Sequence, residues 1–242
     1  MKNYSKHFGF SLAEVLVTMG VLGALAVLTL PTLKTNYEAH VIEAKVKTNY
    51  NLIQQAIANS PNAGSTYKNP TPENWFKRYM KNNIKIAKDC GSTNKCWHDI
   101  KSLSGSVDYG TNRDNVYSFK LENGTSIIIV KEGSLGNRYG IYLGDDTGEI
   151  EDAQANADME ETEDQNKETS ISLWFDINGD EPPNMVGYDV YILGWKNKEM
   201  LPAGYGLKSS TLKNSCKTKS NGRLCMQYII ENGWKVNREI FE

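Results

Sequence analysis

The stretch WFDINGDEPPNMVGYDVY (residues 174–191) holds three oxygen-bearing side chains at alternate positions: Asp176, Asn178 and Asp180. Acids and amides alternate in this way at the start of calcium-binding loops, because Ca²⁺ prefers carboxylate and carbonyl oxygens. The EF-hand pattern then fails, since Glu181 stands where that loop requires glycine and Gly187 where it requires the last glutamate. Asn-Gly and Pro-Pro-Asn are also turn formers. The stretch therefore predicts either a calcium site or a plain turn, and calcium is the only cofactor that this stretch indicates.

The four cysteines form two close pairs in the sequence, Cys90 with Cys96 and Cys216 with Cys225. In an exported protein, close pairs of this kind indicate disulfides that close small loops, although four cysteines allow three connectivities. The alternative is a zinc site, because His98 lies two residues after Cys96. The second pair has no histidine nearby, so we expect the two local disulfides.

The sequence carries none of the common enzyme signatures. It contains no Gly-rich phosphate loop, no HExxH and no GxSxG pattern, and it has only three histidines. We therefore expect no enzymatic activity.

The charges are unevenly distributed along the chain. The formal net charge is −2, from 27 Lys and Arg against 29 Asp and Glu, and by itself favours no partner. Residues 145–168, however, contain eleven acids and a single lysine, Lys167. This stretch has few apolar residues and predicts a solvated loop, with divalent-cation binding as the alternative. It would repel phosphates, so we do not expect nucleic acid as a partner.

The longest apolar run of the chain extends from Phe10 to Pro31 and contains one charged residue, Glu14. A run of about 21 residues suffices for a helix to cross a bilayer, and Lys2 and Lys6 before it place the N-terminus in the cytoplasm. A charged residue at membrane depth costs roughly 2.5–3.5 kcal/mol and is usually functional. A cleaved secretory signal would be shorter and end at a small-residue site such as 24–26. A plain membrane anchor would give no reason for the acid.

This segment resembles the leader of type IV pilins and type II secretion pseudopilins. The resemblance rests on a short basic leader, then Gly9 and Phe10, then Glu14 five residues beyond the glycine, and then an apolar helix with Pro31 at its outer end. It implies that a prepilin peptidase cuts after Gly9 and methylates the new amine of Phe10. It also implies that Glu14 pairs with the amine of a neighbouring subunit. Such a pair would set the register of assembly, because an unpaired buried charge is strongly penalised.

The resemblance thus implies a structural subunit of a type II secretion pseudopilus or a type IV pilus. Its partners would be the peptidase, other pilin or pseudopilin subunits and an inner-membrane assembly platform. The chain would be a single-pass protein of the bacterial cytoplasmic membrane, with its C-terminal domain in the periplasm or outside the cell. Two other classes stay open: an anchored domain that binds an extracytoplasmic ligand and does not polymerise, and a secreted soluble protein.

The elements that must position these residues begin with one long helix. Beyond Pro31 the pattern becomes amphipathic and predicts that the helix continues to about residue 60. Its apolar stripe is expected to be buried against the domain: Ile42, Val46, Tyr50, Ile53 and Ile57. Glu43 and Lys47 are expected on the other faces, and these two have the spacing of a helical ion pair.

After this helix the sequence predicts a short helix capped by Thr71 and then mostly strands. VYSFKL and SIIIV form a hairpin with Asn123-Gly124 at the turn, and further strands are expected at 138–143, 171–175 and 188–193. The predicted fold is therefore α+β: a long helix packed on a mostly antiparallel sheet, in a pilin-like order. The expected domains are a leader (1–9), a transmembrane helix (10–31), the outer half of the helix (32–60) and an exported domain (61–242) that contains the acidic loop 145–168.

Overall fold

The computed structural model describes residues 9, 11–64, 70–106, 115–131, 171–196, 198–237 and 240, without the side chains of residues 31 and 32. Phe10, the predicted strand 138–143 and the acidic loop 145–168 lie outside the described residues. The chain divides into two compact units, Met1–Val41 and Ile42–Glu242. The described elements are a long helix, a second helix, six strands and two short helices, so the predicted α+β class is confirmed.

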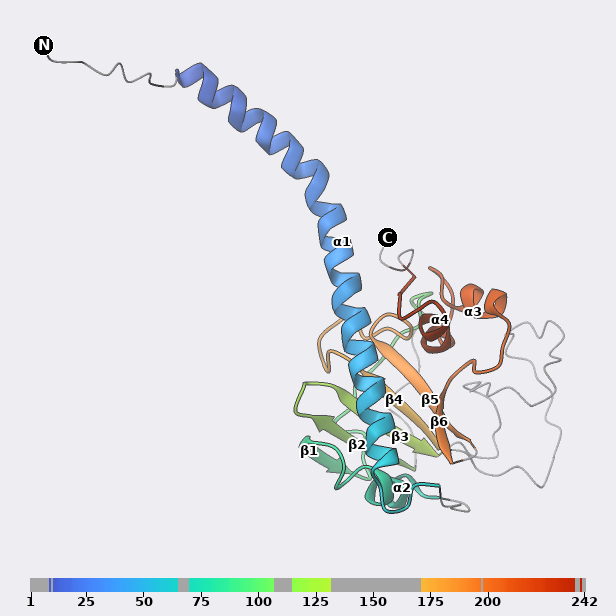
Figure 1. The fold of residues 1–242 in the computed structure, drawn as a ribbon. Coiled ribbons are helices and arrows are strands. Elements are labelled where there is room, and N and C mark those ends of the chain that lie inside the picture. Colours follow the sequence, from blue (N-terminus) through green and yellow to red (C-terminus); the bar gives the residue numbers. More distant parts are fainter. Residues whose placement is uncertain are drawn as a thin grey trace, which may run out of the picture. The chain divides into compact units, whose positions relative to one another are not determined.

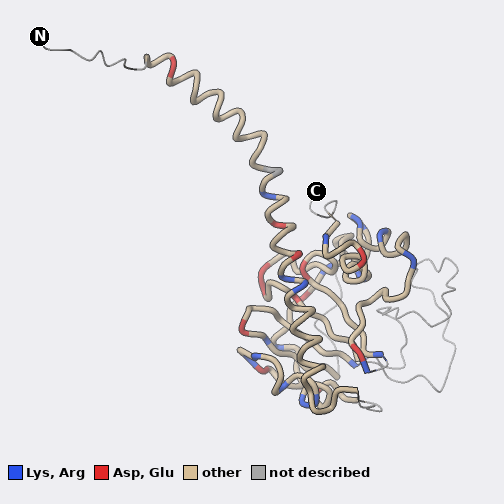
Figure 2. The backbone as a smooth tube through the Cα atoms, viewed as in Figure 1, with Lys and Arg blue, Asp and Glu red and all other residues tan. Residues whose placement is uncertain are grey.

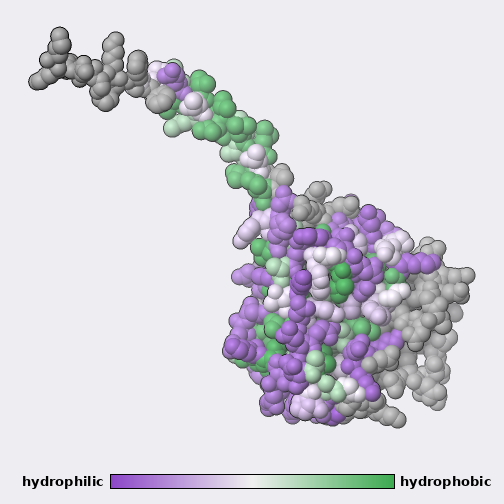
Figure 3. Space-filling model, in the orientation of Figure 1, coloured by the Kyte–Doolittle hydropathy of each residue, from purple (hydrophilic) through white to green (hydrophobic). Residues whose placement is uncertain are grey.

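The first unit contains the beginning of helix α1, which spans Leu12–Ala58 in all. From Leu12 to Leu30 its apolar side chains are exposed on every side, and they form the green part of the helix in Figure 3. A helix that is apolar all round has no single face for a core and is typical of a membrane or of a large protein interior. This helix is long and apolar enough to cross a membrane.

The second unit begins with the rest of α1, which buries the predicted apolar stripe. The buried members are Ile42, Val46, Ile53 and Ile57. The fifth member, Tyr50, is half-buried and packs against Trp234, with the ring centroids 5.5 Å apart. This part of α1 lies across one face of a sheet (Figure 1), where Gln54 Nε2 donates a hydrogen bond to Met200 O at 2.5 Å. The predicted amphipathic pattern is therefore confirmed for this stretch.

One polar position on this helix is predicted wrongly. Glu43 was expected away from the buried stripe, but it is only 7% exposed. Its Oε2 accepts a hydrogen bond from Lys235 Nζ at 2.8 Å, and its Oε1 lies 3.4 Å from the N–H of Val236. The ammonium group of Lys235 offsets part of the cost of burying this carboxylate. The four-residue spacing between Glu43 and Lys47 does not predict this distant ion pair.

A six-stranded antiparallel sheet forms the centre of the second unit, with its strands side by side in chain order (Figure 1). The strands are β1 (Ile86–Gly91), β2 (Val116–Leu121), β3 (Ser126–Lys131), β4 (Ile171–Asp176), β5 (Val190–Lys196) and β6 (Glu199–Pro202). The predicted hairpin is confirmed, because β2 and β3 pair and Gly124 turns the chain with φ 89°. The strand predicted at 188–193 begins later, at Val190, because Gly187–Asp189 belong to a turn.

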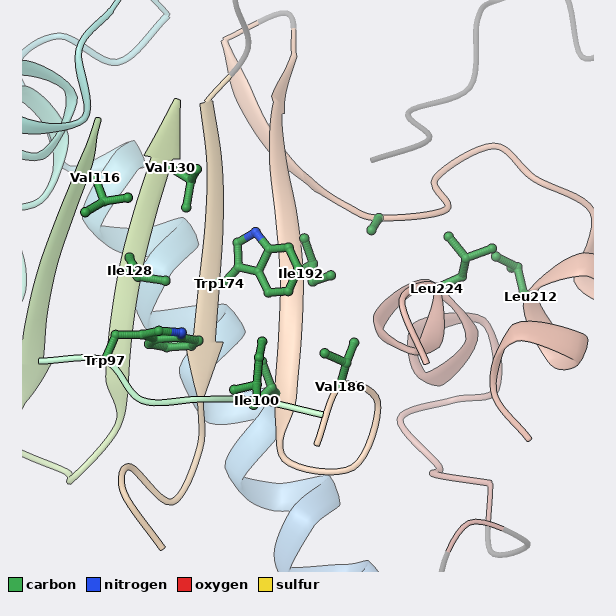
Figure 4. Packing of buried hydrophobic residues seen from close by; sticks show 12 residues of the cluster. Trp97, Ile100, Val116, Ile128, Val130, Trp174, Val186, Ile192, Leu212 and Leu224 are labelled. Carbon is green, nitrogen blue, oxygen red and sulfur yellow. The ribbon is translucent and has the colours of Figure 1, made fainter. Parts of the chain in front are cut away.

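Residues that face each other across antiparallel strands point to the same side of a sheet, so the register defines two faces. On one face Ile128, Trp174 and Ile192 stand in a row across β3, β4 and β5. They form a core cluster with Trp97 and Ile100 from the segment before β2 and with Leu212 and Leu224 near the C-terminus, as Figure 4 shows. The helices that cover this face are α3 (Ser209–Ser215) and α4 (Cys225–Glu231).

The opposite face is covered by α1 and by α2 (Pro72–Tyr79). The predicted cap of α2 is confirmed, since Thr71 Oγ1 accepts a hydrogen bond from the N–H of Asn74 at 3.2 Å and Pro72 occupies the first turn. Phe76 of α2 stacks on Tyr117 of β2 with the ring centroids 4.3 Å apart. The sheet is therefore buried on both sides over β2 to β5, as their burial patterns require.

Candidate functional site

The first candidate site is the beginning of α1 around Glu14. Ser11 and Glu14 bind each other reciprocally: the Ser11 N–H donates to Glu14 Oε2 at 2.8 Å, and the Glu14 N–H donates to Ser11 Oγ at 3.2 Å. This arrangement is a capping box, which satisfies N–H groups that the start of a helix leaves open. Gly9, the predicted cleavage residue, is exposed and precedes the cap, while Phe10 lies outside the described residues. Glu14 therefore has a structural role besides the one predicted for it.

The helix after the cap is suited to surroundings without water. Its two threonines, Thr18 and Thr29, each donate to a carbonyl of the preceding turn, at 2.9 and 3.0 Å. In hydrocarbon an unsatisfied polar group costs several kcal/mol, so internal hydrogen bonds of this kind are needed there. The sequence from Leu12 to Leu30 contains no charged residue other than Glu14. Glu14 is thus the one charge that this stretch would carry into such surroundings.

The second candidate site is the turn after β4, which carries the predicted calcium ligands. Asp176, at the end of β4, is fully buried. Its Oδ1 accepts the N–H of Asn178 at 3.0 Å, and its Oδ2 lies 2.9 Å from His98 Nε2. Burial raises the pKa of Asp176, while the hydrogen bond from His98 acts in the opposite direction. The structure thus pairs a buried acid with a histidine from a distant part of the chain.

Asp180 lies at the exposed rim of the same turn. Its Oδ2 pairs with Lys120 Nζ, and its Oδ1 lies 3.5 Å from His98 Nδ1. The hydrogen bond from Lys120 lowers the pKa of Asp180. Burial disfavours the charged form of His98 and acts to lower its pKa. The hydrogen bond to Asp176 and the negative charge of Asp176 favour the charged form, and Asp180 adds a smaller contribution of the same sign. Together these interactions outweigh burial and raise the pKa of the imidazole. One histidine therefore connects the two predicted ligands.

A second buried carboxylate, Asp189, organises the rest of the turn. Its Oδ1 accepts the N–H of Met185 at 2.6 Å, and its Oδ2 accepts the N–H of Asn184 at 2.9 Å and lies 3.4 Å from Asn178 Nδ2. Burial, and after it the charge of Asp176, raises the pKa of Asp189 to about 7 in spite of these bonds. Two buried acids that disfavour each other's charge favour the uptake of a proton or a cation.

The geometry around these acids bears on the calcium hypothesis in two ways. The side-chain oxygens of Asn178 and Asn184 are buried and accept no hydrogen bond in the part of the chain that the structure describes, so both suit a hard cation. On the other hand, Asp180 is occupied by Lys120, and among the described residues no three His, Cys, Asp or Glu side chains form a group that could hold a metal ion. A calcium ion bound by all three predicted ligands would have to displace Lys120.

Both local disulfides are present in the structure, Cys90–Cys96 and Cys216–Cys225, and no thiol of the chain is left for zinc. The turn after β4 packs closely on the second one. At Gly187, which has φ 89°, an added Cβ would lie 2.7 Å from the sulfur of Cys225. This contact connects the turn to the C-terminal part of the domain.

Three residues around this turn are not indicated by the sequence as partners of the predicted ligands. The sequence suggests His98 only as a zinc ligand beside Cys96, yet in the structure it binds Asp176. Lys120 is placed by strand register, because it stands opposite Ser126, which in turn stands opposite Asp176. The sequence does contain one signal for Asp189. It is the single acid in the otherwise apolar and aromatic run YDVYIL, which indicates a buried carboxylate.

Comparison with known proteins adds nothing to these observations. No protein-family model matches the chain, and neither a curated protein nor a solved structure is significantly similar to it.

Proposed function

We propose that the chain is a structural subunit of a pseudopilus or pilus that is processed after Gly9 and assembles through the first part of α1. The observation that carries this proposal is the stretch from Leu12 to Leu30, which is apolar and exposed on every side and has Glu14 as its only charge. Exposed apolar surface of this extent requires a membrane or the helices of other subunits. The leader residues resemble those of prepilins, as described above.

The helix surface supports association with other helices. A Cβ added at Gly20 or Gly23 would meet no atom within 4 Å, so both positions are free for the close approach of another backbone. Cleavage before Phe10 creates an amine at the end of the helix, and Glu14 then lies one turn away from it in sequence. The amine of one subunit and the carboxylate of the next neutralise each other, which lowers the cost of holding both charges outside water.

The second unit provides the outer part of the subunit in this proposal. Its sheet is buried on both faces over β2 to β5, and two of its loops are closed by disulfides, as suits a domain that works outside the cytoplasm. The subunit has no reaction of its own in this scheme. Its partners are the prepilin peptidase, further subunits and an assembly platform in the membrane.

The mass of the N-terminal peptide of the protein extracted from membranes tests this proposal. Cells with an active prepilin peptidase should yield a peptide that begins at Phe10 and carries one added methyl group. Protein from cells without the peptidase is the control and should begin at Met1. A peptide that begins at Met1 in both would contradict the proposal and favour a membrane-anchored domain that binds a ligand without polymerising. A terminus inside the apolar run would favour a secreted protein.

A further inference from the structure

A basic surface covers the C-terminal part of the second unit. Five basic residues lie between positions 208 and 223: Lys208, Lys213, Lys217, Lys219 and Arg223. The sequence contains no acid from Met200 to Ile230. Figure 2 shows blue positions along α3 and the loop after it. We call these five residues the basic surface.

The fold holds this surface in place rather than leaving it as a loose loop. Leu212 of α3 is fully buried in the core cluster, while Lys208 and Lys213 at the two ends of the helix are exposed. The disulfide Cys216–Cys225 closes the loop that carries the other three basic residues. Within the loop, Ser215 O accepts the N–H of Gly222 at 3.0 Å. The charges therefore belong to a fixed surface, which reduces the ordering required when a partner binds.

The lysines of this surface lack acidic partners in the described part of the chain. Lys208, Lys213, Lys217 and Lys219 form no ion pair there, and Lys217 Nζ bonds only the neutral side chain of Asn214, at 3.0 Å. The acid at the border, Glu231, is occupied by Ser209 and Gln227. Positive charges grouped in this way repel one another, so an anionic partner would stabilise the surface.

We propose that the basic surface of one subunit binds the acidic stretch 145–168 of a neighbouring copy of this chain. The charges are complementary, since that stretch has eleven acids and one lysine. It belongs to residues 132–170, whose flanking residues Lys131 and Ile171 are paired on adjacent strands. A chain of this length can extend at most roughly 65 Å out and back, so it can project well beyond the sheet edge that carries it.

This inference rests on the proposed function, because it requires subunits that assemble. It also fits that function in its symmetry. The contact joins two different surfaces of the same chain, and contacts of this heterologous kind produce open helical filaments when they do not close into a ring. Two basic surfaces that met each other would repel, so the same charges disfavour a symmetric dimer through this face.

Cross-linking with two isotope forms tests the contact. Heavy-isotope and unlabelled full-length protein, both from cells with the prepilin peptidase, are mixed in detergent and reconstituted together into vesicles. A carbodiimide then joins lysine amines to carboxylates that touch them. We expect linked heavy–light peptides between Lys213, Lys217 or Lys219 and residues 145–168, with a yield that falls several-fold at about 0.5 M salt because screening weakens exposed ion pairs.

A matched pair of variants separates this contact from general charge effects. The triple variant Lys213→Gln, Lys217→Gln, Lys219→Gln should lose heavy–light links to the acidic stretch at its remaining lysine, Lys208. The control Lys81→Gln, Lys85→Gln, Lys88→Gln removes the same charge from three exposed lysines elsewhere and should keep the links.

Three results would overturn the inference: links within one isotope form only, no links at all, or equal loss in both variants. Loss of binding to duplex DNA in the first variant, without heavy–light links in the parent protein, would assign the surface to nucleic acid instead. The N-terminal mass of the same samples keeps the two proposals apart. A methylated Phe10 without heavy–light links removes the contact and leaves the proposed function, whereas a Met1 terminus removes the proposed function.

Discussion

Replacing Glu14 by glutamine separates the two roles that this residue can have. Glutamine serves in a capping box as glutamate does, so Glu14→Gln keeps the acceptor for the Ser11 N–H and removes only the negative charge. Ser11→Ala does the reverse, because it removes the hydroxyl that accepts the Glu14 N–H and leaves the carboxylate in place. If the charge joins subunits, Glu14→Gln should abolish assembly and Ser11→Ala should preserve it.

The expected sizes of the two effects differ. Loss of a helix cap costs about 0.5–2 kcal/mol, and in a helix of 47 residues this frays the first turn only. A charge at the centre of a bilayer costs roughly 2.5–3.5 kcal/mol, and less in the first turn of a helix, where Glu14 lies, so we take about 2 kcal/mol. Pairing with an amine in the assembled state removes this cost for Glu14, so assembly gains about 2 kcal/mol per contact. A neutral glutamine carries no such cost in the free subunit and therefore gains nothing from assembly. Each contact is then weakened roughly 30-fold, since 1.4 kcal/mol corresponds to tenfold.

The assay measures the fraction of protein in sheared filaments, at equal membrane levels of the parent protein, Glu14→Gln, Glu14→Ala and Ser11→Ala. The N-terminal mass of each variant shows whether processing is intact, as we expect for all of them. Normal filaments from Glu14→Gln would refute the reasoning and reduce Glu14 to a helix cap. Filaments lost only in Ser11→Ala and Glu14→Ala would also assign the effect to the cap.

Three further predictions concern the second unit. The pKa of Asp189 is raised from 3.8 to about 7 on folding, so the stability that this raised pKa contributes is complete below pH 3.8 and is lost as the pH rises through 7. Thermal unfolding should therefore show a loss of about 2–3 kcal/mol in the free energy of unfolding from pH 5 to pH 8. A higher Tm at pH 8 than at pH 5 would contradict this. The calcium hypothesis predicts that millimolar calcium raises the Tm of the parent protein but not that of Asp176→Asn, and no calorimetric heat at millimolar calcium would exclude it. Gly222→Ala should destabilise the chain by about 3 kcal/mol or more, because a Cβ there overlaps a backbone carbonyl at φ 75°. Gly105→Ala is its control, with φ 78° and no atom within 4 Å, and should cost only about 1–2 kcal/mol of backbone strain in urea unfolding; equal costs would show that the overlap is relieved.

Elements with their own local signals were predicted correctly from the sequence. The hairpin carries Asn-Gly at a turn that needs a positive φ, the second helix carries a threonine cap followed by proline, and the outer part of α1 carries apolar residues at helical spacing. Each of these signals acts over a few residues. The α+β class follows from their order along the chain.

Elements that depend on distant contacts were not predicted. β1 is an edge strand whose central residues are exposed, and β6 has only four residues, so neither shows an apolar alternation. The helices α3 and α4 have seven residues each and no side-chain cap. They are held by the burial of Leu212 and by the disulfide between Cys216 and Cys225, and neither follows from helical periodicity.

The turn after β4 shows the same division within one site. The alternation of Asp176, Asn178 and Asp180 is visible in the sequence and indicates a turn with several oxygen donors. Their partners were invisible, since His98 and Lys120 lie 78 and 60 residues away from the acids that they bind. Sequence patterns therefore identify polar groups in unusual places, and the fold decides which group neutralises them.

Glu14 differs from the buried polar residues of the second unit in the source of its partner. Glu43 is buried in α1 and receives a cation from Lys235, and Asn49 is buried nearby and receives donors from Asn123 and Thr125, both at 2.9 Å. Both of these polar residues thus have a matching partner from a distant part of the same chain. Glu14 accepts one N–H from its own turn and meets no cation within the described residues. In the proposed function, the amine freed by cleavage in a neighbouring subunit is the group that would neutralise this charge.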